Sequence, residues 1–377
     1  MKVCGIVCEY NPFHNGHKHQ IDVIKNRLGY DTVVGVMSGN FTQRGDVAVF
    51  DKSVRANAAI MNGMDLVVDL PTVHALQSAE IFAENAVFIL NALGVDALSF
   101  GSESEDLDSM KRLAQLFVKE SPEFVSALKS ELRQGKPYHL ARSSAASKIL
   151  GGGCGDILKE PNNILAIEYL KALLRLDSPM IPHPIKRDSS HHNDSEIYGS
   201  IASATAVRSG LKNQNPSALS AVPDNCGKLY KQSKIHDIER LSTAIISKII
   251  LSDAELIRKV PDVSEGLENK IKKAARDSKS FSELCDNIKS KRYAHSRIRR
   301  ILINFLLGIT ADNASVRPQY IKILGFGSKG QMLLNHKKKT CPLPLAKNRN
   351  AVKNNPAAAK LWDRELQFDM IYKLSEV

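Results

Sequence analysis

Cysteine is scarce in this chain, and its spacing forms no metal-binding pattern. Six of the 377 residues are cysteine, at positions 4, 8, 154, 226, 285 and 341, and none of them forms a C-x-x-C pair. A structural zinc site is therefore not expected, and no residue is predicted to ligate a metal. Cysteines scattered in this way usually serve as small apolar side chains in a protein of a reducing compartment.

Long hydrophobic runs are missing as well. No apolar stretch is long enough to span a bilayer. Met1 and Lys2 lead directly into the first apolar run, so no signal peptide is expected and we predict a cytoplasmic location. The sequence has no repeat of fixed period and no string typical of an RNA-recognition motif, a KH domain or a zinc knuckle. RNA binding therefore has to be argued from other features.

Positive charge is in excess. Lys and Arg number 52 against 40 Asp and Glu, which gives a net charge of +12. This balance favours a polyanionic partner, although many basic proteins bind no nucleic acid. Hydrophobic residues make up 43% and charged residues 24%, as in ordinary globular proteins. At roughly 100–200 residues per domain, the length predicts two or three domains.

Apolar runs alternate with helical patterns in the first half of the chain. The runs lie at residues 3–7, 32–37, 65–70 and 96–100, with helical periodicity at 52–62 and 77–93. This alternation predicts an α/β fold, a Rossmann-like parallel sheet covered on both faces. A further strand near residues 180–187 would complete the sheet. We predict a catalytic domain over residues 1–213 and a mainly helical, basic region over residues 214–377.

The first strand leads into an unusual turn. Pro12 breaks the strand, and His14-Asn15-Gly16-His17 follows where a helix begins. The N-terminus of a helix suits phosphate, and two imidazoles there would donate hydrogen bonds to phosphate oxygens. Two histidines near a chain terminus can also be a surface accident. The carboxyl end of a strand is nevertheless where open α/β sheets bind ligands.

Two other polar strings follow predicted strands. The GNFTQRG string spans residues 39–45, and Gly101-Ser102-Glu103 follows the fourth strand. Both would lie at the same edge of the sheet as the histidines, which favours one nucleotide site. The GNFTQRG string fits a substrate-binding loop and a plain surface loop equally well.

The string GIVCEYNPFHNGHKHQI identifies a known family. His14-Asn15-Gly16-His17 resembles the H-x-G-H signature of the nucleotidyltransferase superfamily. The longer string resembles the tRNA(Met) cytidine acetate ligases, which acetylate the wobble cytidine of elongator tRNA(Met) with acetate and ATP. The resemblance implies ATP as a substrate, with Mg²⁺ expected, and elongator tRNA(Met) and acetate as partners.

The resemblance also implies a set of site residues. The expected catalytic residues are His14 and His17, which contact the triphosphate, and Arg208, which binds the β and γ phosphates through its guanidinium fork. Arg208 ends the string IASATAVR, a looser match to the superfamily's second signature, and a surface ion pair is the alternative. The expected ATP-binding residues are Val7, Cys8, Glu9, Tyr10, Asn11, Pro12, Phe13, His14, Asn15, Gly16, His17, Lys18, His19, Gln20, Gly101, Asn162 and Arg187.

Gly101, Asn162 and Arg187 lie outside the segment at residues 7–20, and two of these three assignments have plainer alternatives. A base or ribose can stack on the bare backbone at Gly101. The resemblance places one asparagine of the E-P-N-N string on the nucleotide; sequence does not separate Asn162 from Asn163, and we choose Asn162. Either one is also a reasonable helix N-cap. Arg187 can equally be a solvated charge.

A basic strip at residues 289–300 supplies the candidates for RNA contact. It reads KSKRYAHSRIRR, where Tyr293 is suited to stack on a base. A helix with one solvated face explains the same charges. The predicted RNA-binding residues are Lys291, Arg292, Tyr293, Arg297, Arg299 and Arg300.

The resemblance implies an ATP-dependent ligase that forms N4-acetylcytidine through acetyl-adenylate, and the H-x-G-H turn and the positive charge agree with it. The first alternative is an adenylyltransferase that joins AMP to a small phosphate metabolite, which leaves the basic helical half without a role. The second is a non-catalytic RNA-binding protein, against which the intact H-x-G-H string argues. The sequence says nothing about the oligomeric state.

Overall fold

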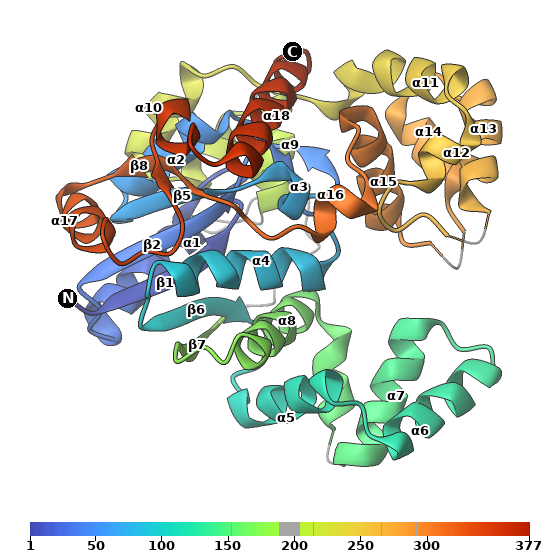
Figure 1. The fold of residues 1–377 in the computed structure, drawn as a ribbon, viewed down its shortest axis with the longest axis horizontal. Coiled ribbons are helices and arrows are strands. Elements are labelled where there is room, and N and C mark those ends of the chain that lie inside the picture. The colour runs from blue at the N-terminus through green and yellow to red at the C-terminus, as the bar shows by residue number, and fades with distance from the viewer. Residues whose placement is uncertain (152, 188–203, 214, 265, 291–292) are drawn as a thin grey trace.

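A seven-stranded sheet forms the centre of the molecule (Figure 1). The computed structural model describes residues 1–377 apart from 152, 188–203, 214, 265 and 291–292. The strand order is β7-β6-β1-β2-β5-β8-β9. The strands are β1 (Val3–Cys8), β2 (Thr32–Ser38), β5 (Leu66–Leu70), β6 (Ala97–Ser102), β7 (Ile181–Lys186), β8 (Ile321–Phe326) and β9 (Leu345–Ala346). A separate hairpin pairs β3 (Phe41–Thr42) with β4 (Asp46–Val47).

Five of the strands form the predicted parallel core. β1 pairs in parallel with β2 and β6, β2 with β5, and β6 with β7. The chain builds outward from β1 to β2 and β5, and then returns to the other side of β1 for β6 and β7. The order of connection therefore reverses between β1 and β6, which is where doubly wound sheets bind their ligands. The predicted α/β fold with a Rossmann-like sheet is confirmed.

Residues from beyond position 213 extend this sheet. β8 pairs antiparallel with β5, and β9 pairs in parallel with β8. The domain boundary near residue 213 stays a prediction. Strands from both sides of this boundary form one sheet. Within the described residues the later part is otherwise helical, as expected.

Helices cover both faces of the sheet. One face carries α4 (Ala79–Ala92), α8 (Pro161–Arg175) and α17 (Ser328–Lys337), and their core includes Val36 and Leu98 from the strands. The other carries α1 (Asn15–Asp22), α2 (Lys52–Met61) and α10 (Asp224–Lys231), with Ile6 and Val67. Alternate strand residues enter opposite cores, because successive side chains point to opposite faces.

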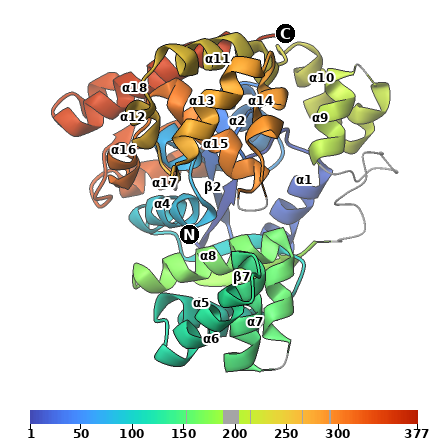
Figure 2. The ribbon, with the colours of Figure 1, turned by 90° about the vertical axis from the view of Figure 1, so that its right-hand side faces the viewer.

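Two helical bodies extend beyond the carboxyl ends of the parallel strands, one at the bottom and one at the top in the view of Figure 2. The first contains α5 (Leu107–Val118), α6 (Pro122–Arg133), α7 (Tyr138–Leu150) and η2 (Cys154–Lys159). The second contains η5 (Ile238–Leu241), α11 (Ser242–Leu251), α12 (Ala254–Arg258), α13 (Leu267–Asp277), α14 (Phe281–Ile288) and α15 (His295–Leu307), with an apolar core of its own. The remaining helices are η1 (Val23–Arg27), α3 (Thr72–Ala75), α9 (Ala204–Lys212), η4 (Pro216–Ala221), α16 (Ala311–Ser315), η6 (Arg349–Val352) and α18 (Pro356–Lys373). Across the described residues, none of the helices combines the length and the apolar composition needed to cross a bilayer.

Prolines protect β7, which is an edge strand of the sheet among the described residues. The N–H groups of Ile181 and Arg187 donate to Asp96 O at 3.0 Å and to Ser102 O at 2.8 Å on the β6 side. Residues 182 and 184 therefore direct their nitrogens outward, since alternate residues of a strand face opposite neighbours. Both are proline and carry no N–H. This edge is a poor template for another strand.

The C-terminal helix α18 packs back onto the carboxyl end of β5. Glu365 accepts a hydrogen bond from Thr72 N, and its other oxygen lies 2.7 Å from Thr72 Oγ1. Asp369 accepts from Lys52 Nζ at 2.7 Å and from Asn40 Nδ2 at 3.0 Å. Asn40 is the second residue of the GNFTQRG string, which follows β2. Its hydrogen bond to Asp369 therefore ties the loop to α18.

Replacing Glu365 with glutamine is expected to flatten part of the pH dependence of stability. Burial, and then the charge of Asp69, raise the pKa of Glu365 to about 7. A carboxyl group with a raised folded-state pKa contributes stability that is complete below its unfolded pKa and is lost as the pH rises through 7. From pH 5 to pH 8, Glu365→Gln should gain about 2–3 kcal/mol in unfolding free energy relative to wild type.

Urea unfolding at each pH measures this difference. The exposed Glu255→Gln is the matched control for the removal of one carboxylate. Parallel stability curves for wild type and Glu365→Gln would show that Glu365 does not titrate in this range.

Candidate active site

His14 and His17 cap the N-terminus of α1 and hold each other in place. His14 Nδ1 accepts a hydrogen bond from Gly16 N at 3.1 Å, and His14 N donates to His17 Nδ1 at 3.2 Å. The two rings stack with centroids 3.7 Å apart. Because each Nδ1 accepts from a backbone N–H, the proton of each neutral ring lies on Nε2. The H-x-G-H string therefore forms a reciprocal capping box and leaves two Nε2–H donors.

Both imidazoles are neutral at physiological pH. Burial, together with the charges of Arg187 and Arg208, lowers the pKa of His14 to about 3. Burial first, and then His14 and Arg187, hold the pKa of His17 well below its ordinary value. Neutral Nε2–H donors beside a helix N-terminus suit anionic oxygens without adding fixed charge.

Arg208 reaches the same site from α9. Its Nη1 donates to Asn11 O at 2.7 Å and its Nη2 to Thr205 Oγ1 at 3.0 Å. Burial lowers its pKa, while the carboxylates of Asp46 and Glu9 oppose this effect. These contacts fix the guanidinium beside the turn that precedes His14. The plain surface ion pair is wrong as a description of Arg208, because it is partly buried and bonded to the turn.

Arg187 and Gly101 lie next to each other at the ends of β7 and β6. A Cβ atom on Gly101 would come within 2.8 Å of Arg187 Cδ. The aliphatic part of Arg187 therefore covers the glycine backbone, where we expected a base or ribose to stack. The charge of Glu103 favours the charged form of Arg187, although burial lowers its pKa overall.

The two asparagines of the E-P-N-N string have different surroundings. Asn163 is 2% exposed, and its Oδ1 accepts from the backbone N–H groups of Glu103 and Ser104 at 2.9 and 3.0 Å. Asn162 is half-buried and donates from Nδ2 to Glu103 Oε1 at 2.5 Å. Neither one is the N-cap of α8, which is Glu160, so that alternative is wrong. Asn163 holds the loop after β6, and nucleotide contact by Asn162 stays a prediction.

The rest of the predicted ATP-binding segment surrounds the two histidines. Val7 and Cys8 end β1, and Tyr10 and Phe13 are buried with their ring centroids 4.7 and 5.6 Å from that of His17. Glu9 Oε1 accepts from Gln43 N at 2.7 Å. Along α1, Asn15 and Gln20 are half-buried, whereas Lys18 and His19 are exposed. Asn11, Pro12 and Gly16 shape the turn, where Asn11 Oδ1 accepts from Val49 N at 2.8 Å.

The basic strip lies at the start of α15 and is tied to its own chain. Lys291 and Arg292 lie outside the described residues. Tyr293 is 9% exposed, and its ring lies 5.0 Å from the guanidinium of Arg297. Arg297 donates to Asp262 O at 2.6 Å and to Ser264 Oγ at 2.9 Å.

Of two further arginines of the strip, Arg300 is buried and Arg299 is half-buried. Arg300 is 8% exposed and pairs with Asp262 at 3.3 Å. Arg299 donates to Gly45 O at 2.8 Å and pairs with Asp46 at 2.9 Å. A helix with a solvated face is therefore wrong for this part of the strip. RNA contact by Tyr293, Arg297, Arg299 and Arg300 stays a prediction, and the contacts described above tie these side chains to other residues of the chain.

Sequence reasoning did not select three residues that shape this site. Glu103 holds the asparagine pair and was signalled by the Gly101-Ser102-Glu103 string. Arg44 lies at the tip of the β3–β4 hairpin, inside the GNFTQRG string. Arg55 is fully buried in α2 and donates to the carbonyls of Glu9, Ser38, Gly39 and Phe50. No local pattern distinguishes Arg55 from an exposed helix residue.

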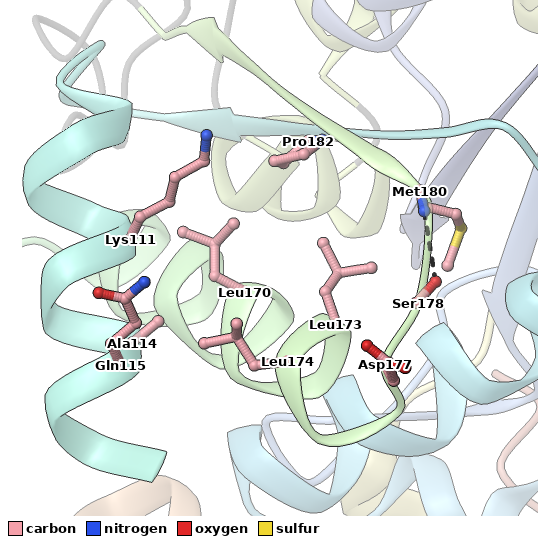
Figure 3. Close-up of a pocket in the computed structure, with 10 residues that line it drawn as sticks. All are labelled: Lys111, Ala114, Gln115, Leu170, Leu173, Leu174, Asp177, Ser178, Met180 and Pro182. Carbon is pink, nitrogen blue, oxygen red and sulfur yellow. Dashed lines mark hydrogen bonds between the residues drawn. The ribbon is translucent and has the colours of Figure 1, made fainter. Parts of the chain in front are cut away.

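A groove of about 220 Å³ lies elsewhere, between α5, α8 and β7 (Figure 3). Its lining residues are Lys111, Ala114, Gln115, Leu170, Leu173, Leu174, Asp177, Ser178, Met180 and Pro182. None of the predicted site residues lines it. Among the described residues, no three His, Cys, Asp or Glu side chains are arranged to hold a metal ion.

Comparison with known proteins places this geometry in a family. The model of the HIGH Nucleotidyl Transferase family matches residues 1–377. A protein named tRNA(Met) cytidine acetate ligase from Acetivibrio thermocellus is 40% identical over 370 residues, covering 92% of this chain and 88% of the relative. One with the same name from a Thermoanaerobacter species is 38% identical over 386 residues, covering 100% and 96%.

Two solved structures have the same fold. Apo TmcAL from Thermotoga maritima matches with a TM-score of 0.93 at 30% identity, covering 100% of this chain and 96% of that one. The same protein bound with alpha-thio ATP matches with a TM-score of 0.87 at 31% identity, covering 98% and 92%.

Proposed function

This chain belongs to the HIGH nucleotidyl transferase family and, within it, to the tRNA(Met) cytidine acetate ligases, and we propose that its site activates acetate with ATP and acetylates the wobble cytidine of elongator tRNA(Met). ATP-dependent ligation and a tRNA substrate follow from the family. The observation that supports the position of the chemistry is the His14–His17 pair, two neutral donors at the N-terminus of a helix.

The first step is attack by an acetate oxygen on the α-phosphorus of ATP. A new bond joins acetate to this phosphorus, the bond to the β-phosphate oxygen breaks, and pyrophosphate leaves with its electron pair. Catalysis of such a transfer consists mainly of positioning and of stabilising charge. The Nε2–H groups of His14 and His17 stabilise charge on the α-phosphate oxygens, and Arg208 binds the leaving β and γ phosphates.

The second step transfers the acetyl group to RNA. The exocyclic amine of the cytidine attacks the acetyl carbonyl, a carbon–nitrogen bond forms, and AMP leaves while the amine loses a proton. This amine is a weak nucleophile, so the mixed anhydride with AMP supplies the leaving group that the reaction needs. Asn162, Arg187 and the segment at residues 7–20 hold the nucleotide through both steps.

Mg²⁺ is expected to arrive with the nucleotide. The carboxylates beside the site, those of Glu9 and Glu103, accept hydrogen bonds from Gln43 N and from Asn162 and Asn163, and no three ligating side chains of the described residues are arranged around a metal position. This donor set does not fit a magnesium ion held by protein carboxylates. We therefore derive no step through the metal. A cytoplasmic location remains part of the proposal.

Exchange of labelled pyrophosphate into ATP tests the proposed function. With purified protein, we expect exchange that depends on acetate and needs no RNA, because activation precedes transfer. Addition of tRNA(Met) should then produce acetylcytidine, which mass spectrometry of nuclease digests detects. Exchange that ignores acetate and requires a phosphate metabolite would instead favour the adenylyltransferase.

A further inference from the structure

The β3–β4 hairpin presents Arg44 at its tip. Thr42 pairs with Asp46, and Gly45 N donates to Thr42 O at 3.0 Å, which closes a four-residue turn. Gln43 and Arg44 occupy the two central positions of this turn. Arg44 is exposed, although the strands on either side of it are mostly buried.

α15 supports the hairpin from the helical body. Arg299 donates to Gly45 O and pairs with Asp46, and its guanidinium lies 4.8 Å from the centre of the Phe281 ring. Gly45 has a φ of +76°, and a Cβ atom there would be 2.5 Å from Arg300 N. The turn therefore rests directly on the backbone of α15, and only glycine fits this contact.

A second set of contacts ties the hairpin to the nucleotide segment. Gln43 N donates to Glu9 Oε1 at 2.7 Å, one residue beyond β1. The side chain of Gln43 donates to Gln77 O at 3.0 Å, two residues beyond α3. With Gln43 and Gly45 both anchored, the hairpin has a fixed place at the carboxyl end of the sheet.

Arg44 lies within electrostatic range of the other two arginines of the site. Burial lowers the pKa of Arg187 and of Arg208. The carboxylate of Glu103 opposes this effect at Arg187, and those of Asp46 and Glu9 oppose it at Arg208, while the positive charge of Arg44 adds to the lowering of both pKa values. Three guanidinium groups therefore act on one region that also contains the two Nε2–H donors. Such a concentration of like charge is unfavourable by itself and favours a ligand with several negative charges.

We propose that Arg44 binds the β and γ phosphates of ATP and the pyrophosphate that leaves, and that Arg299 is the residue that positions it. A triphosphate brings about four negative charges into one site, whereas an RNA backbone spreads single charges along its length. The arginine cluster therefore fits ATP better than RNA. The inference rests on the proposed function only in taking ATP as the ligand.

Calorimetric titration of the full chain with ATP, pyrophosphate and AMP tests this assignment. Arg44→Ala should weaken ATP and pyrophosphate binding by about 10- to 100-fold, the range for one charge-assisted hydrogen bond, and leave AMP affinity within about twofold. Arg44→Lys should recover part of the loss, since lysine keeps the charge but not the fork.

Arg299→Met tests the positioning role without altering a phosphate contact. We expect it to weaken ATP binding by about 5- to 10-fold, and the Arg44→Ala/Arg299→Met double variant to bind no more weakly than Arg44→Ala. Gly45→Ala should resemble Arg299→Met. Gly29→Ala is its matched control, because Gly29 has a φ of +72° but nothing within 4 Å of an added Cβ.

Four results would overturn the inference: unchanged ATP affinity in Arg44→Ala, an equal loss for AMP, a loss confined to tRNA acetylation, or additive effects in the double variant. The test measures ligand binding. It therefore remains valid even if the protein shows no acetate-dependent exchange. A wild type that discriminates ATP from AMP through Arg44 but shows no exchange would reject the proposed reaction and keep this assignment.

Discussion

Replacing His17 with alanine is expected to lower the rate of acetate-dependent ATP–pyrophosphate exchange by about 10²- to 10³-fold, the usual cost of one preorganised donor to a developing anion. The ring donates from Nε2 because its Nδ1 accepts from His14 N. Alanine removes that donor and also leaves the His14 N–H without its side-chain partner. Two effects are therefore mixed in this variant, one on the chemistry and one on the helix cap.

Asparagine at position 17 separates the two effects. Its Oδ1 can take the place of Nδ1 and accept from His14 N, but it supplies no donor in the place of Nε2. We expect His17→Asn to lose exchange activity as His17→Ala does and to unfold near the wild-type temperature. His17→Ala should be less stable by about 1 kcal/mol, as is typical for loss of a cap. An active His17→Asn would remove the Nε2 donor from the mechanism.

The exchange rate should also be independent of histidine titration between pH 6 and pH 8. The pKa values of His14 and His17 are held low by burial and by neighbouring positive charge, so both rings stay neutral across this range. A rate that rises or falls with a pKa near 6.5, and that loses this feature in His17→Asn, would show that a charged imidazole takes part.

Replacing Arg55 with alanine is expected to destabilise the protein by roughly 3–5 kcal/mol, the range for breaking a buried charged network. Arg55 is fully buried, and it donates to backbone carbonyls of residues 9, 38, 39 and 50. The first three lie just after β1 and at the end of β2, where the candidate active site begins. Loss of these donors leaves several buried carbonyls unpaired and releases both segments.

Urea unfolding and ATP titration together measure this effect. Arg112 is the matched control, because it is exposed and donates to a single carbonyl, Leu150 O, at 2.8 Å. Arg112→Ala should change the unfolding free energy by less than about 0.5 kcal/mol. Arg55→Lys should lie between wild type and Arg55→Ala. Stability close to wild type in Arg55→Ala would show that water or backbone movement replaces the guanidinium.

Local patterns were sufficient for the parallel core of the fold. Residues 3–7, 32–37, 65–70 and 96–100 read as buried strands because they are continuous apolar runs, and each lies in or overlaps an observed strand. The position of His14 and His17 followed from the same reasoning, since a strand followed by a helix places its turn at the carboxyl edge of a sheet.

Long-range partners were not visible in the sequence. β8 pairs with β5 across about 250 residues, and no local signal records that choice. The high charge density at residues 289–300 suggested a solvent-exposed surface. In the structure, however, Arg299 pairs with Asp46 of the β3–β4 hairpin and Arg300 pairs with Asp262. Asn162 and Asn163 are adjacent and chemically identical, so only the position of the loop at residues 103–104 distinguishes them.

The return of the C-terminal segment to the sheet has a consequence for synthesis. Strand β5 ends at Leu70, and the strand beside it begins at Ile321. At roughly 5–20 residues per second, a ribosome needs about 10–50 s to make the intervening chain, during which β5 is an exposed edge. Asp369, the hydrogen-bond partner of Asn40, is synthesised later still. A nascent chain stalled before α18 would therefore carry both histidines and still lack the support of its GNFTQRG loop, so activity should appear only after α18 has been synthesised.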